Sequence, residues 1–314
     1  MQPDALSLLY TLTLKALQEA PDEARRLVHG RGRLWEGLEQ ITVDWLQGVL
    51  RVSLFREMPE ADLTRLIQSL NTLSQSEVWH AKGGQHILLQ HRYLPDSRTD
   101  FLVGEPIDQW VVSENGLKYV LDFGRKQNSG LFLDMRLGRQ WVKENSQNLR
   151  VLNLFAYTCA FSVAAIEGGA THVANLDMAR AALSRGRENH RLNGHDLSKV
   201  EFFGHELFKS WGKVSRSGPY DLIIIDPPSF QKGSFILSRD YQKILRRLPE
   251  LLTANGRVLA CVNDPSVGPE FLLENMAQVA PELIFVERLE NPPEFLDQNP
   301  DSALKALVFQ RQPR

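Results

Sequence analysis

An acid, two prolines and an aromatic ring follow a run of apolar residues in the stretch YDLIIIDPPSF, residues 220–230. Four consecutive aliphatic residues suit a strand that is buried on both faces, as in a parallel sheet between helices. Proline has no backbone N–H for the ladder, so Asp226-Pro227-Pro228 must end this strand. The carboxylate and carbonyl oxygens of this rigid turn can accept hydrogen bonds from an exocyclic amine, while Phe230 offers a ring for stacking. The stretch therefore predicts a site for a planar base that carries an amine, and the alternative is a turn with a buried phenylalanine.

A second candidate site follows the strand predicted at residues 150–154. Asn153 interrupts this apolar strand just before the turn Phe155-Ala156-Tyr157, and Thr158 can cap the helix that follows. A strand that turns directly into a helix is where nucleotide-type ligands bind in open α/β sheets. The turn does not contain the G-x-G-x-x-G pattern that lets a backbone approach a pyrophosphate. A cofactor without phosphates fits better than a dinucleotide, and an ordinary strand–helix turn remains the alternative.

Acids follow the next two predicted strands. Asp177 follows Asn153 at close to the ~20-residue offset at which an acid meets ribose hydroxyls. A carboxylate can accept hydrogen bonds from both hydroxyls of a cis-diol, although Asp177 could equally cap the helix predicted at residues 178–192. Past the third strand, His205 and Glu206 could meet an adenine amine or be ordinary surface-loop residues.

The elements that position these residues belong to a doubly wound α/β pattern. From residue 126 to 314, predicted strands alternate with helices, which indicates a mainly parallel, seven-stranded sheet. The strands are predicted at residues 150–154, 173–177, 200–203, 221–226, 256–262, 283–287 and 305–310, and the main helices at 158–167, 178–192, 239–253 and 269–279.

Residues 1–125 predict a smaller N-terminal α+β domain. Alternating apolar residues flank Gln47-Gly48, and a second turn signal, Asn115-Gly116, separates two further strand patterns. Both patterns predict β-hairpins, because asparagine and glycine tolerate the positive φ angles of a type I′ turn. Leucines at helical spacing predict an amphipathic helix over residues 63–73, and HILLQHRYL predicts another strand.

Composition restricts the class of protein. The chain has 314 residues, 43% hydrophobic and 24% charged, with a net charge of −2. No apolar run approaches the ~20 residues of a membrane-spanning helix, and the N-terminus is interpreted as a folded helix, not a signal peptide. Two cysteines cannot form a disulfide framework or a metal cluster. We therefore expect a cytoplasmic protein with no membrane partner and no metal, as a monomer or homodimer.

The motifs NLFAYT, LDM, DLIIIDPPSF and GLFLDMR together resemble the class I S-adenosylmethionine-dependent methyltransferases, which have a Rossmann-like fold. More narrowly, they are similar to the bacterial 23S ribosomal RNA methyltransferases that modify cytosine or guanine. The resemblance covers about residues 105–314 and implies S-adenosylmethionine as cofactor and RNA, ribosomal RNA in particular, as partner.

The resemblance also implies roles for individual residues. Asp177 is expected to hold the ribose, Glu206 to lie near the adenine, and Arg136, beside Asp134 in the Leu-Asp-x-Arg segment, to bind the cofactor's carboxylate. The residues expected along the methionine part of the cofactor are Asn153, Phe155, Ala156 and Tyr157. Those expected to face the methyl group and the target base are Asp226, Pro227, Pro228 and Phe230.

Two positions depart from the family's pattern. The family usually has glycine where this chain has Cys159, and more often aspartate where it has Glu206. A cysteine fits the turn without strain only if the turn needs no left-handed residue there.

The cysteines bear on which base is modified. Methylation at cytosine C5 needs a thiolate beside the base, and relatives that modify cytosine carry it just past the fifth strand. Here Cys261 lies inside that strand, with Asn263-Asp264 after it, so Cys261 is interpreted as a buried structural thiol. We therefore favour N-methylation of guanine over cytosine C5, with Asp226 orienting the amine and accepting its proton.

An RNA base inside a duplex must be extruded to be modified, and RNA needs positive charge nearby. The basic residues in three runs are Arg25, Arg26, Arg31 and Arg33; Lys209, Lys213 and Arg216; and Arg239, Lys243, Arg246 and Arg247. Such runs are often only solvated faces. The N-terminal domain is the expected substrate-recognition module.

Two other functions are compatible with parts of the pattern. An RNA-binding or assembly protein that kept the fold and lost methyl transfer would explain Cys159-Ala160 in the cofactor turn. A nicotinamide-dependent oxidoreductase shares the sheet, but the glycine fingerprint that binds its dinucleotide is not present.

Overall fold

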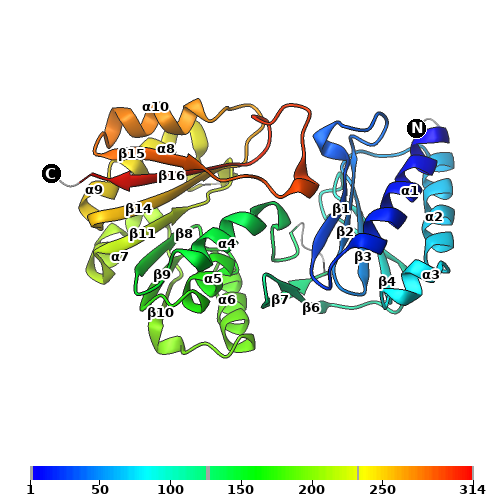
Figure 1. Cartoon of the computed structure of the whole chain (residues 1–314), viewed down its shortest axis with the longest axis horizontal. Coiled ribbons are helices and arrows are strands. Elements are labelled where there is room, and N and C mark those ends of the chain that lie inside the picture. The colour runs from blue at the N-terminus through cyan, green and yellow to red at the C-terminus, as the bar shows by residue number, and fades with distance from the viewer. Residues whose placement is uncertain (1–2, 125–127, 232, 313–314) are drawn as a thin grey trace. The chain divides into compact units, whose positions relative to one another are not determined.

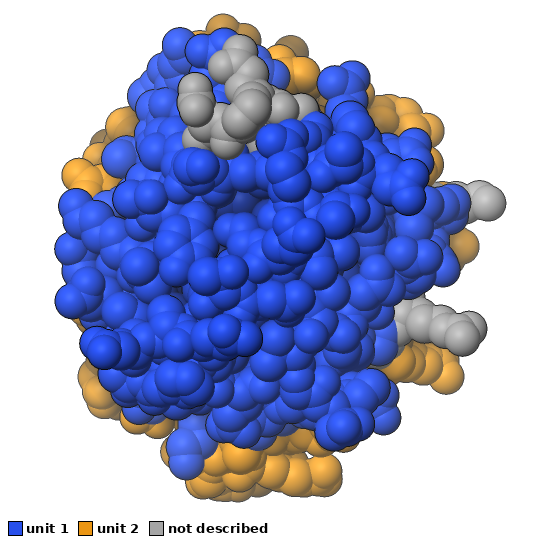
Figure 2. Space-filling model, turned by 90° about the vertical axis from the view of Figure 1, so that its right-hand side faces the viewer, with its two compact units in different colours: residues 1–133, 292–300 blue, residues 134–291, 301–314 orange. Residues whose placement is uncertain are grey.

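The computed structural model describes residues 3–124, 128–231 and 233–312, which form two compact units, coloured separately in Figure 2. Unit 1 comprises residues 1–133 and 292–300, and unit 2 comprises residues 134–291 and 301–314. The domain boundary predicted between residues 125 and 126 lies outside the described residues.

Unit 1 is built on a five-stranded sheet with strand order β1-β2-β3-β4-β5 (Figure 1). The strands are β1 (Arg25–His29), β2 (Ile41–Trp45), β3 (Val49–Leu54), β4 (His86–His91) and β5 (Thr99–Val103). The helices are α1 (Pro3–Glu19), α2 (Glu60–Leu73) and α3 (Glu77–Ala81). Leucines of α1 and α2 pack with alternate strand residues in one apolar core. The strand β4 runs parallel to β3 because α2 and α3 carry the chain back to the end of the sheet at which β3 begins.

Both predicted hairpins of unit 1 are confirmed. The strands β2 and β3 are antiparallel, and Gln47 and Gly48 between them have φ angles of 51° and 101°. The strands β6 (Gln109–Glu114) and β7 (Leu117–Asp122) are joined by Asn115 and Gly116, with φ angles of 53° and 75°. Both residues of the second turn have the positive φ that a type I′ turn requires.

Unit 2 contains the predicted seven-stranded sheet, in the order β10-β9-β8-β11-β14-β16-β15. The strands are β8 (Arg150–Leu154), β9 (His172–Leu176), β10 (Val200–Phe203), β11 (Tyr220–Ile225), β14 (Leu252–Val262), β15 (Leu283–Arg288) and β16 (Lys305–Arg311). All neighbours pair in parallel except β16, which is antiparallel to both β14 and β15. The doubly wound, mainly parallel α/β fold is thus confirmed.

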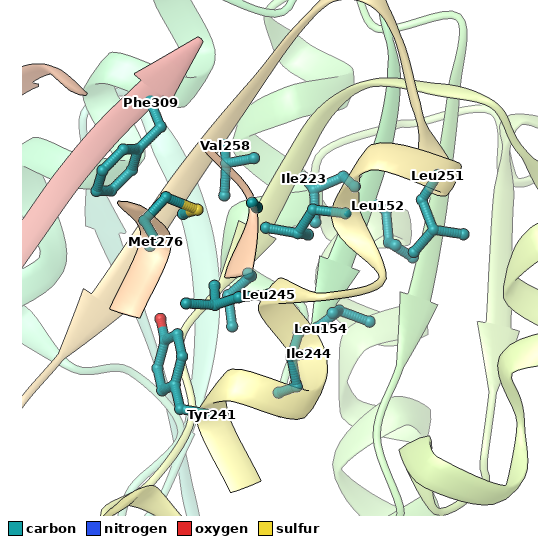
Figure 3. Close-up of a cluster of buried hydrophobic side chains, with 14 of the residues drawn as sticks. Leu152, Leu154, Ile223, Tyr241, Ile244, Leu245, Leu251, Val258, Met276 and Phe309 are labelled. Atoms are coloured by element: carbon teal, nitrogen blue, oxygen red, sulfur yellow. The ribbon is translucent and has the colours of Figure 1, made fainter. Parts of the chain in front are cut away.

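Helices cover both faces of this sheet (Figure 1). They are α4 (Arg136–Glu144), α5 (Ala160–Glu167), α6 (Arg180–Leu192), α7 (Trp211–Ser217), α8 (Leu237–Leu245), α9 (Leu248–Leu251) and α10 (Glu270–Val279). Figure 3 shows the core on one face, where Tyr241 and Leu245 of α8 and Met276 of α10 pack with strand residues such as Ile223 and Val258. Burial on both faces explains the unbroken aliphatic run of β11.

One predicted helix is divided in the structure. The sequence pattern predicts a helix over residues 239–253, but α8 ends at Leu245 and α9 covers only Leu248–Leu251. Pro249 lies in the first turn of α9, where its missing N–H is tolerated, whereas inside a continuous helix it would remove a hydrogen bond.

In the described part of the chain, no helix has the length and apolar character needed to cross a membrane.

Candidate active site at the carboxyl edge of the sheet

The strand register aligns the predicted site residues along one edge of the sheet. Leu154 at the end of β8 pairs with Leu176 of β9 on one side and with Ile225 of β11 on the other. The residues that follow these three strand ends are Phe155, Asp177 and Asp226. Adjacent parallel strands therefore deliver the cofactor turn, the expected ribose acid and the Asp-Pro-Pro corner to the edge where α/β sheets bind ligands.

A pocket with an empty volume of about 280 Å³ opens at this edge. Three residues predicted for cofactor binding, Phe155, Asp177 and Glu206, line it together. The described residues that line it are Phe155, Leu176, Asp177, Met178, His205, Glu206, Leu207, Phe208, Gln231, Ser234 and Phe235. Two acids among apolar and aromatic walls suit a nucleoside better than a phosphate chain, and the lining residues that the structure describes include no lysine or arginine.

Asp177 fastens the cofactor turn to the second strand. Its Oδ2 accepts a hydrogen bond from the Tyr157 backbone N–H at 2.8 Å, and its Oδ1 accepts one from the Ala179 N–H at 2.7 Å. Burial raises the pKa of this carboxyl above its usual range, while the two backbone donors oppose that shift. Each carboxylate oxygen has a further lone pair, so Asp177 can still accept bonds from a diol.

Glu206 has a local structural role as well as a place in the pocket. Its Oε1 accepts a hydrogen bond from the Phe208 backbone N–H at 2.8 Å and so caps the short helix η4 (Leu207–Lys209). Its Oε2 lies 3.6 Å from the exposed Lys209 ammonium. These contacts hold the carboxylate at the pocket wall.

Sequence reasoning identified Phe155 but missed the other two phenylalanines that line the pocket, Phe208 and Phe235. The rings of Phe155 and Phe235 lie with their centroids 5.1 Å apart, and Phe235 belongs to a small hairpin formed by β12 (Phe230–Gln231) and β13 (Phe235–Ile236). The hairpin returns the chain to the pocket directly after the Asp-Pro-Pro-Ser corner. Gly233, with a φ of 79°, is the one signal in the sequence for this turn.

The cofactor turn itself is left-handed at three alternate residues. Phe155, Tyr157 and Cys159 have φ angles of 56°, 47° and 60°. Residues other than glycine seldom adopt this conformation, and such strain gathers at functional sites. The position where the family usually has glycine therefore does need a left-handed residue, and Cys159 occupies it.

A glycine on the neighbouring helix makes room for the Cys159 side chain. The thiol is fully buried, and a Cβ added to Gly186 of α6 would lie only 2.4 Å from Cys159 Sγ. Burial raises the pKa of this thiol well above its usual range, so it stays protonated at neutral pH. Gly186 thus leaves the space that the Cys159 side chain occupies where the family usually has glycine. The sequence alone did not indicate that these two residues are in contact.

Asn153 of β8 belongs to a buried chain of hydrogen-bonded side chains. It is 1% exposed, and its Nδ2 donates to Asn175 Oδ1 at 2.9 Å. Asn175 Nδ2 donates to Ser162 Oγ, which contacts His190 Nε2 at 2.9 Å. Burial lowers the pKa of His190 to about 3, so the chain is neutral. Asn153 therefore links β8 to β9 and α5, and its contact with a cofactor stays a prediction.

The remaining residues expected to bind the cofactor are not among the described residues of the pocket lining. Ala156 is buried and its N–H donates to the Leu176 carbonyl at 3.1 Å. Tyr157 is half-buried and contributes the backbone donor to Asp177. Arg136 is the half-buried first residue of α4. None of these three lines the 280 Å³ pocket, and their roles stay predictions.

Asp226 has an unusual electrostatic environment for a partly exposed acid. Desolvation of its carboxyl, and then the negative charge of Asp134, raise the pKa of Asp226 to about 7, and Arg139 opposes that shift. Asp134 is held by Asn263, whose Nδ2 donates to its Oδ2 at 2.9 Å. The carboxyl therefore changes charge near neutral pH, where a general base is most effective.

The corner after Asp226 begins with a buried residue, Pro227, and ends with an exposed one, Phe230. Pro227 is buried, and the Ser229 carbonyl accepts a hydrogen bond from the Leu237 N–H at 3.1 Å. Phe230 is 63% exposed, so the alternative of a buried phenylalanine is wrong. The exposed ring offers a surface on which a planar base can stack.

Cys261 is a buried thiol inside β14. It is fully buried, and its carbonyl accepts a hydrogen bond from the Tyr241 hydroxyl at 3.1 Å. Burial, followed by the charges of Asp226 and Asp134, raises the pKa of the thiol far above its usual range. Cys261 therefore stays protonated at neutral pH. Within the described ranges, no group of three or more His, Cys, Asp or Glu side chains could hold a metal ion.

The sheet order, with a pocket lined by two acids and aromatic rings at its carboxyl edge, is that of the class I methyltransferase fold. The model of the S-adenosylmethionine-dependent methyltransferase family matches residues 25–310, so the chain belongs to that family and its cofactor is S-adenosylmethionine. The acids and aromatic rings of the pocket fit the ribose and adenine of that cofactor.

Curated relatives share sequence with about half to seven tenths of this chain. Ribosomal RNA large subunit methyltransferase I of Aeromonas salmonicida is 31% identical over 229 residues, which are 71% of this chain and 57% of the relative. Ribosomal RNA large subunit methyltransferase K/L of Psychrobacter arcticus is 37% identical over 154 residues, 47% of this chain and 20% of the relative. The chain thus spans little more than half the length of the first relative.

Solved structures show the same fold. One from Streptococcus mutans, described as a candidate S-adenosylmethionine-dependent methyltransferase, superposes with a TM-score of 0.84 at 23% identity. The match covers 97% of this chain and 81% of that one. At this identity the likeness supports the fold alone.

Proposed function

We propose that this protein transfers a methyl group from S-adenosylmethionine to a ribosomal RNA base in the cytoplasm, with a guanine nitrogen favoured over cytosine C5. The observation that carries the proposal is the corner after β11, where the Asp226 carboxyl has a pKa near 7 and Phe230, four residues further on, exposes its ring. The relatives named as large-subunit ribosomal RNA methyltransferases support the choice of substrate.

The cofactor supplies an electrophilic methyl group when it is bound. Asp177 would accept hydrogen bonds from the ribose hydroxyls, and Glu206 would accept one from the adenine amine. Phe155, Ala156 and Tyr157 would line the methionine part, and Asn153 would brace them from below. Arg136 would bind the cofactor's carboxylate, as the family resemblance implies.

Asp226 would orient the target base and take its proton. As a carboxylate it accepts hydrogen bonds from an exocyclic amine, and the two prolines restrict where that amine can lie. A nitrogen that gains a methyl group must lose a proton, and a carboxyl with a pKa of about 7 can accept it at physiological pH. Phe230 would stack on the base that has been extruded from the RNA.

The two thiols support a nitrogen target. Attack at cytosine C6, which activates C5, needs an accessible thiolate. Cys159 and Cys261 are both fully buried, and burial holds the pKa of each thiol above its usual range. Neither cysteine offers a nucleophile to a base at the corner.

The test uses ribosomal RNA from a strain that lacks the gene. The RNA is incubated with the protein and methyl-labelled S-adenosylmethionine, digested to nucleosides and analysed by mass spectrometry. We expect labelled N-methylguanosine, at a yield that survives Cys261→Ser. Labelled 5-methylcytidine that disappears in Cys261→Ser would contradict the guanine assignment, and no labelled nucleoside would contradict RNA methylation itself.

A further inference from the structure

Unit 1 gathers four arginines outside the site described above. In β2 and β3, Val43, Leu50 and Val52 point into the core with α1 and α2. The intervening residues Asp44 and Arg51 therefore lie on the opposite face of the sheet. Arg26 of β1 reaches the same carboxylate, and Arg92 follows β4.

One acid, Asp44, forms ion pairs with two of these arginines. Asp44 Oδ1 lies 2.5 Å from Arg26 Nε, and its Oδ2 lies 2.8 Å from Arg51 Nη2. Arg51 and Arg92 also donate to neutral oxygens, Ser129 Oγ at 2.6 Å and Asn128 Oδ1 at 3.2 Å, respectively. One carboxylate thus faces a cluster of guanidinium groups and leaves a positive excess.

Arg31 is presented by a turn that only glycine allows. It lies between Gly30 and Gly32 in the helix η1 (Gly30–Gly32), and a Cβ on these glycines would lie 1.9 Å from the Leu38 carbonyl oxygen and 2.0 Å from that of Leu296. Arg31 is exposed, and within the described residues its guanidinium has no hydrogen-bond or ion-pair partner.

An aromatic ring holds two of the guanidinium groups together. The Arg31 Cζ atom lies 4.2 Å and the Arg92 Cζ atom 5.1 Å from the centroid of the Phe55 ring. Such cation–π contacts orient a guanidinium plane and leave its N–H groups available. The ring therefore fixes two like charges near one another.

Burial and the neighbouring positive charges lower the pKa values of Arg92 and His29 in this cluster. Burial, followed by the charges of Arg51 and Arg31, lowers the pKa of Arg92 to about 10. Burial and then Arg26 lower the pKa of His29 to about 4, and its Nδ1 accepts a hydrogen bond from Arg26 Nη1 at 2.8 Å. His29 is therefore neutral and adds no charge to the cluster.

We propose that Arg26, Arg31, Arg51 and Arg92, held by Asp44 and Phe55, form an arginine cluster whose exposed member, Arg31, binds a phosphate group of an RNA backbone. Arg51 is buried and donates to Asp44 and Ser129, so it adds positive charge without contacting the phosphate. Guanidinium groups match phosphate oxygens in pairs, and the phosphates offset the repulsion between the arginines. Backbone contacts of this kind position RNA without reading its sequence. The choice of RNA as the polyanion rests on the proposed function.

The test measures binding of a fluorescein-labelled, mixed-sequence 20-nucleotide RNA to the full chain by anisotropy, over a series of salt concentrations. Arg31→Gln should weaken binding about fivefold at low salt and reduce the magnitude of the slope of log K against log salt by about 0.7, the loss of one phosphate contact. Phe55→Leu, which keeps every charge, should weaken binding about twofold to threefold.

Arg65→Gln is the matched control, since Arg65 lies on α2, on the other face of the sheet, and is paired with Asp62. It removes the same charge from the same unit and should change affinity less than twofold. Equal effects of Arg31→Gln and Arg65→Gln would overturn the cluster as a site, as would unchanged binding in Arg31→Gln. Unlabelled inorganic phosphate that competes as well as RNA, at equal phosphate concentration, would overturn the RNA assignment.

The outcome separates this inference from the proposed function. S-adenosylhomocysteine binding by the same samples reports the folded cofactor site and does not depend on the cluster. If the RNA is methylated but Arg31→Gln binds it normally, the cluster is wrong and the function stands. If Arg31→Gln weakens RNA binding while no methyl transfer occurs, the cluster stands and the function is wrong.

Discussion

Two turns leave neighbouring strands at the same edge of the sheet, and they obtain their shapes by opposite means. The corner at residues 226–230 is shaped by its own residues, because two prolines stop β11 and restrict the backbone. The turn at residues 155–159 has three left-handed residues, none of them glycine, and depends on its neighbours Asp177 and Gly186. Both turns were recognised in the sequence as candidate sites, but only the conformation of the corner, which its own prolines determine, could be predicted there.

The difference between the two turns also suggests that they have different roles. The left-handed turn borders the pocket, where a cofactor would be held, and the proline corner carries the acid that titrates near neutral pH. Strain and raised pKa values are both unfavourable for stability and are commonly found at functional sites. Four predictions test whether each turn does what its structure suggests.

The largest effect is expected from Asp226→Ala. If the corner orients the base and accepts its proton, the substitution should lower kcat for methyl transfer by about a thousandfold, or about 4 kcal/mol of activation free energy. Single-turnover assays with saturating cofactor measure this loss. Asp264→Ala, which alters a neighbouring loop acid, is the control, and a comparable loss there would mean that any damage near the corner has the same effect.

The next effect concerns the left-handed turn and its glycine. Gly186→Ala should lower the free energy of unfolding by about 1–3 kcal/mol, because the new Cβ meets Cys159 Sγ. In a Cys159→Gly background the same change should be neutral or stabilising by up to about 1 kcal/mol, since alanine favours a helix. Urea unfolding of the four proteins completes this double-mutant cycle. Equal effects in both backgrounds would show that Gly186 and Cys159 are not coupled.

A smaller effect is expected on the free energy of unfolding, and on its dependence on pH, when Asp226 is replaced. Because the pKa of Asp226 is raised in the folded state, its carboxylate costs stability as pH rises from about 4 to 7, and that cost is complete above pH 7. Asp226→Asn should therefore raise the free energy of unfolding by about 1 kcal/mol at pH 8, and the gain should shrink as pH falls to 5. A gain that is independent of pH would indicate another cause.

The smallest effect is a shift of the pH–rate profile. Methyl transfer should rise with pH through about 7, as Asp226 loses its proton and becomes able to accept another. Asp134→Asn removes the neighbouring negative charge, lowers the pKa of Asp226 and should move this limb to lower pH by less than one unit. Arg139→Gln should move it to higher pH. Shifts of the same sign in both variants would exclude this electrostatic explanation.

Much of unit 2 was predictable from sequence because its signals are local. Aliphatic runs mark the strands, and their alternation with helices is sufficient for a doubly wound sheet. Asp177 and Asp226 were recognised because each follows such a run directly. The division of α8 from α9 was missed because apolar spacing continues across Pro249.

The features that escaped prediction depend on contacts between distant segments. The partnership of Cys159 with Gly186 joins a turn to a helix that begins after the next strand. The segment 292–300 packs in unit 1, where Phe295 lies against Arg26, although its neighbours in sequence belong to unit 2. The arginine cluster draws on separate strands, so only part of it was visible as the basic run near residue 31.

The central claim is that Asp177 serves the cofactor and Asp226 serves the base. Calorimetric titration of S-adenosylhomocysteine into the wild type, Asp177→Ala and Asp226→Ala tests it directly. We predict that Asp226→Ala binds within about threefold of the wild type, while Asp177→Ala, having lost the expected diol acceptor and the anchor of the left-handed turn, binds at least about thirtyfold more weakly. Equal losses in both variants, or a larger loss in Asp226→Ala, would contradict this division.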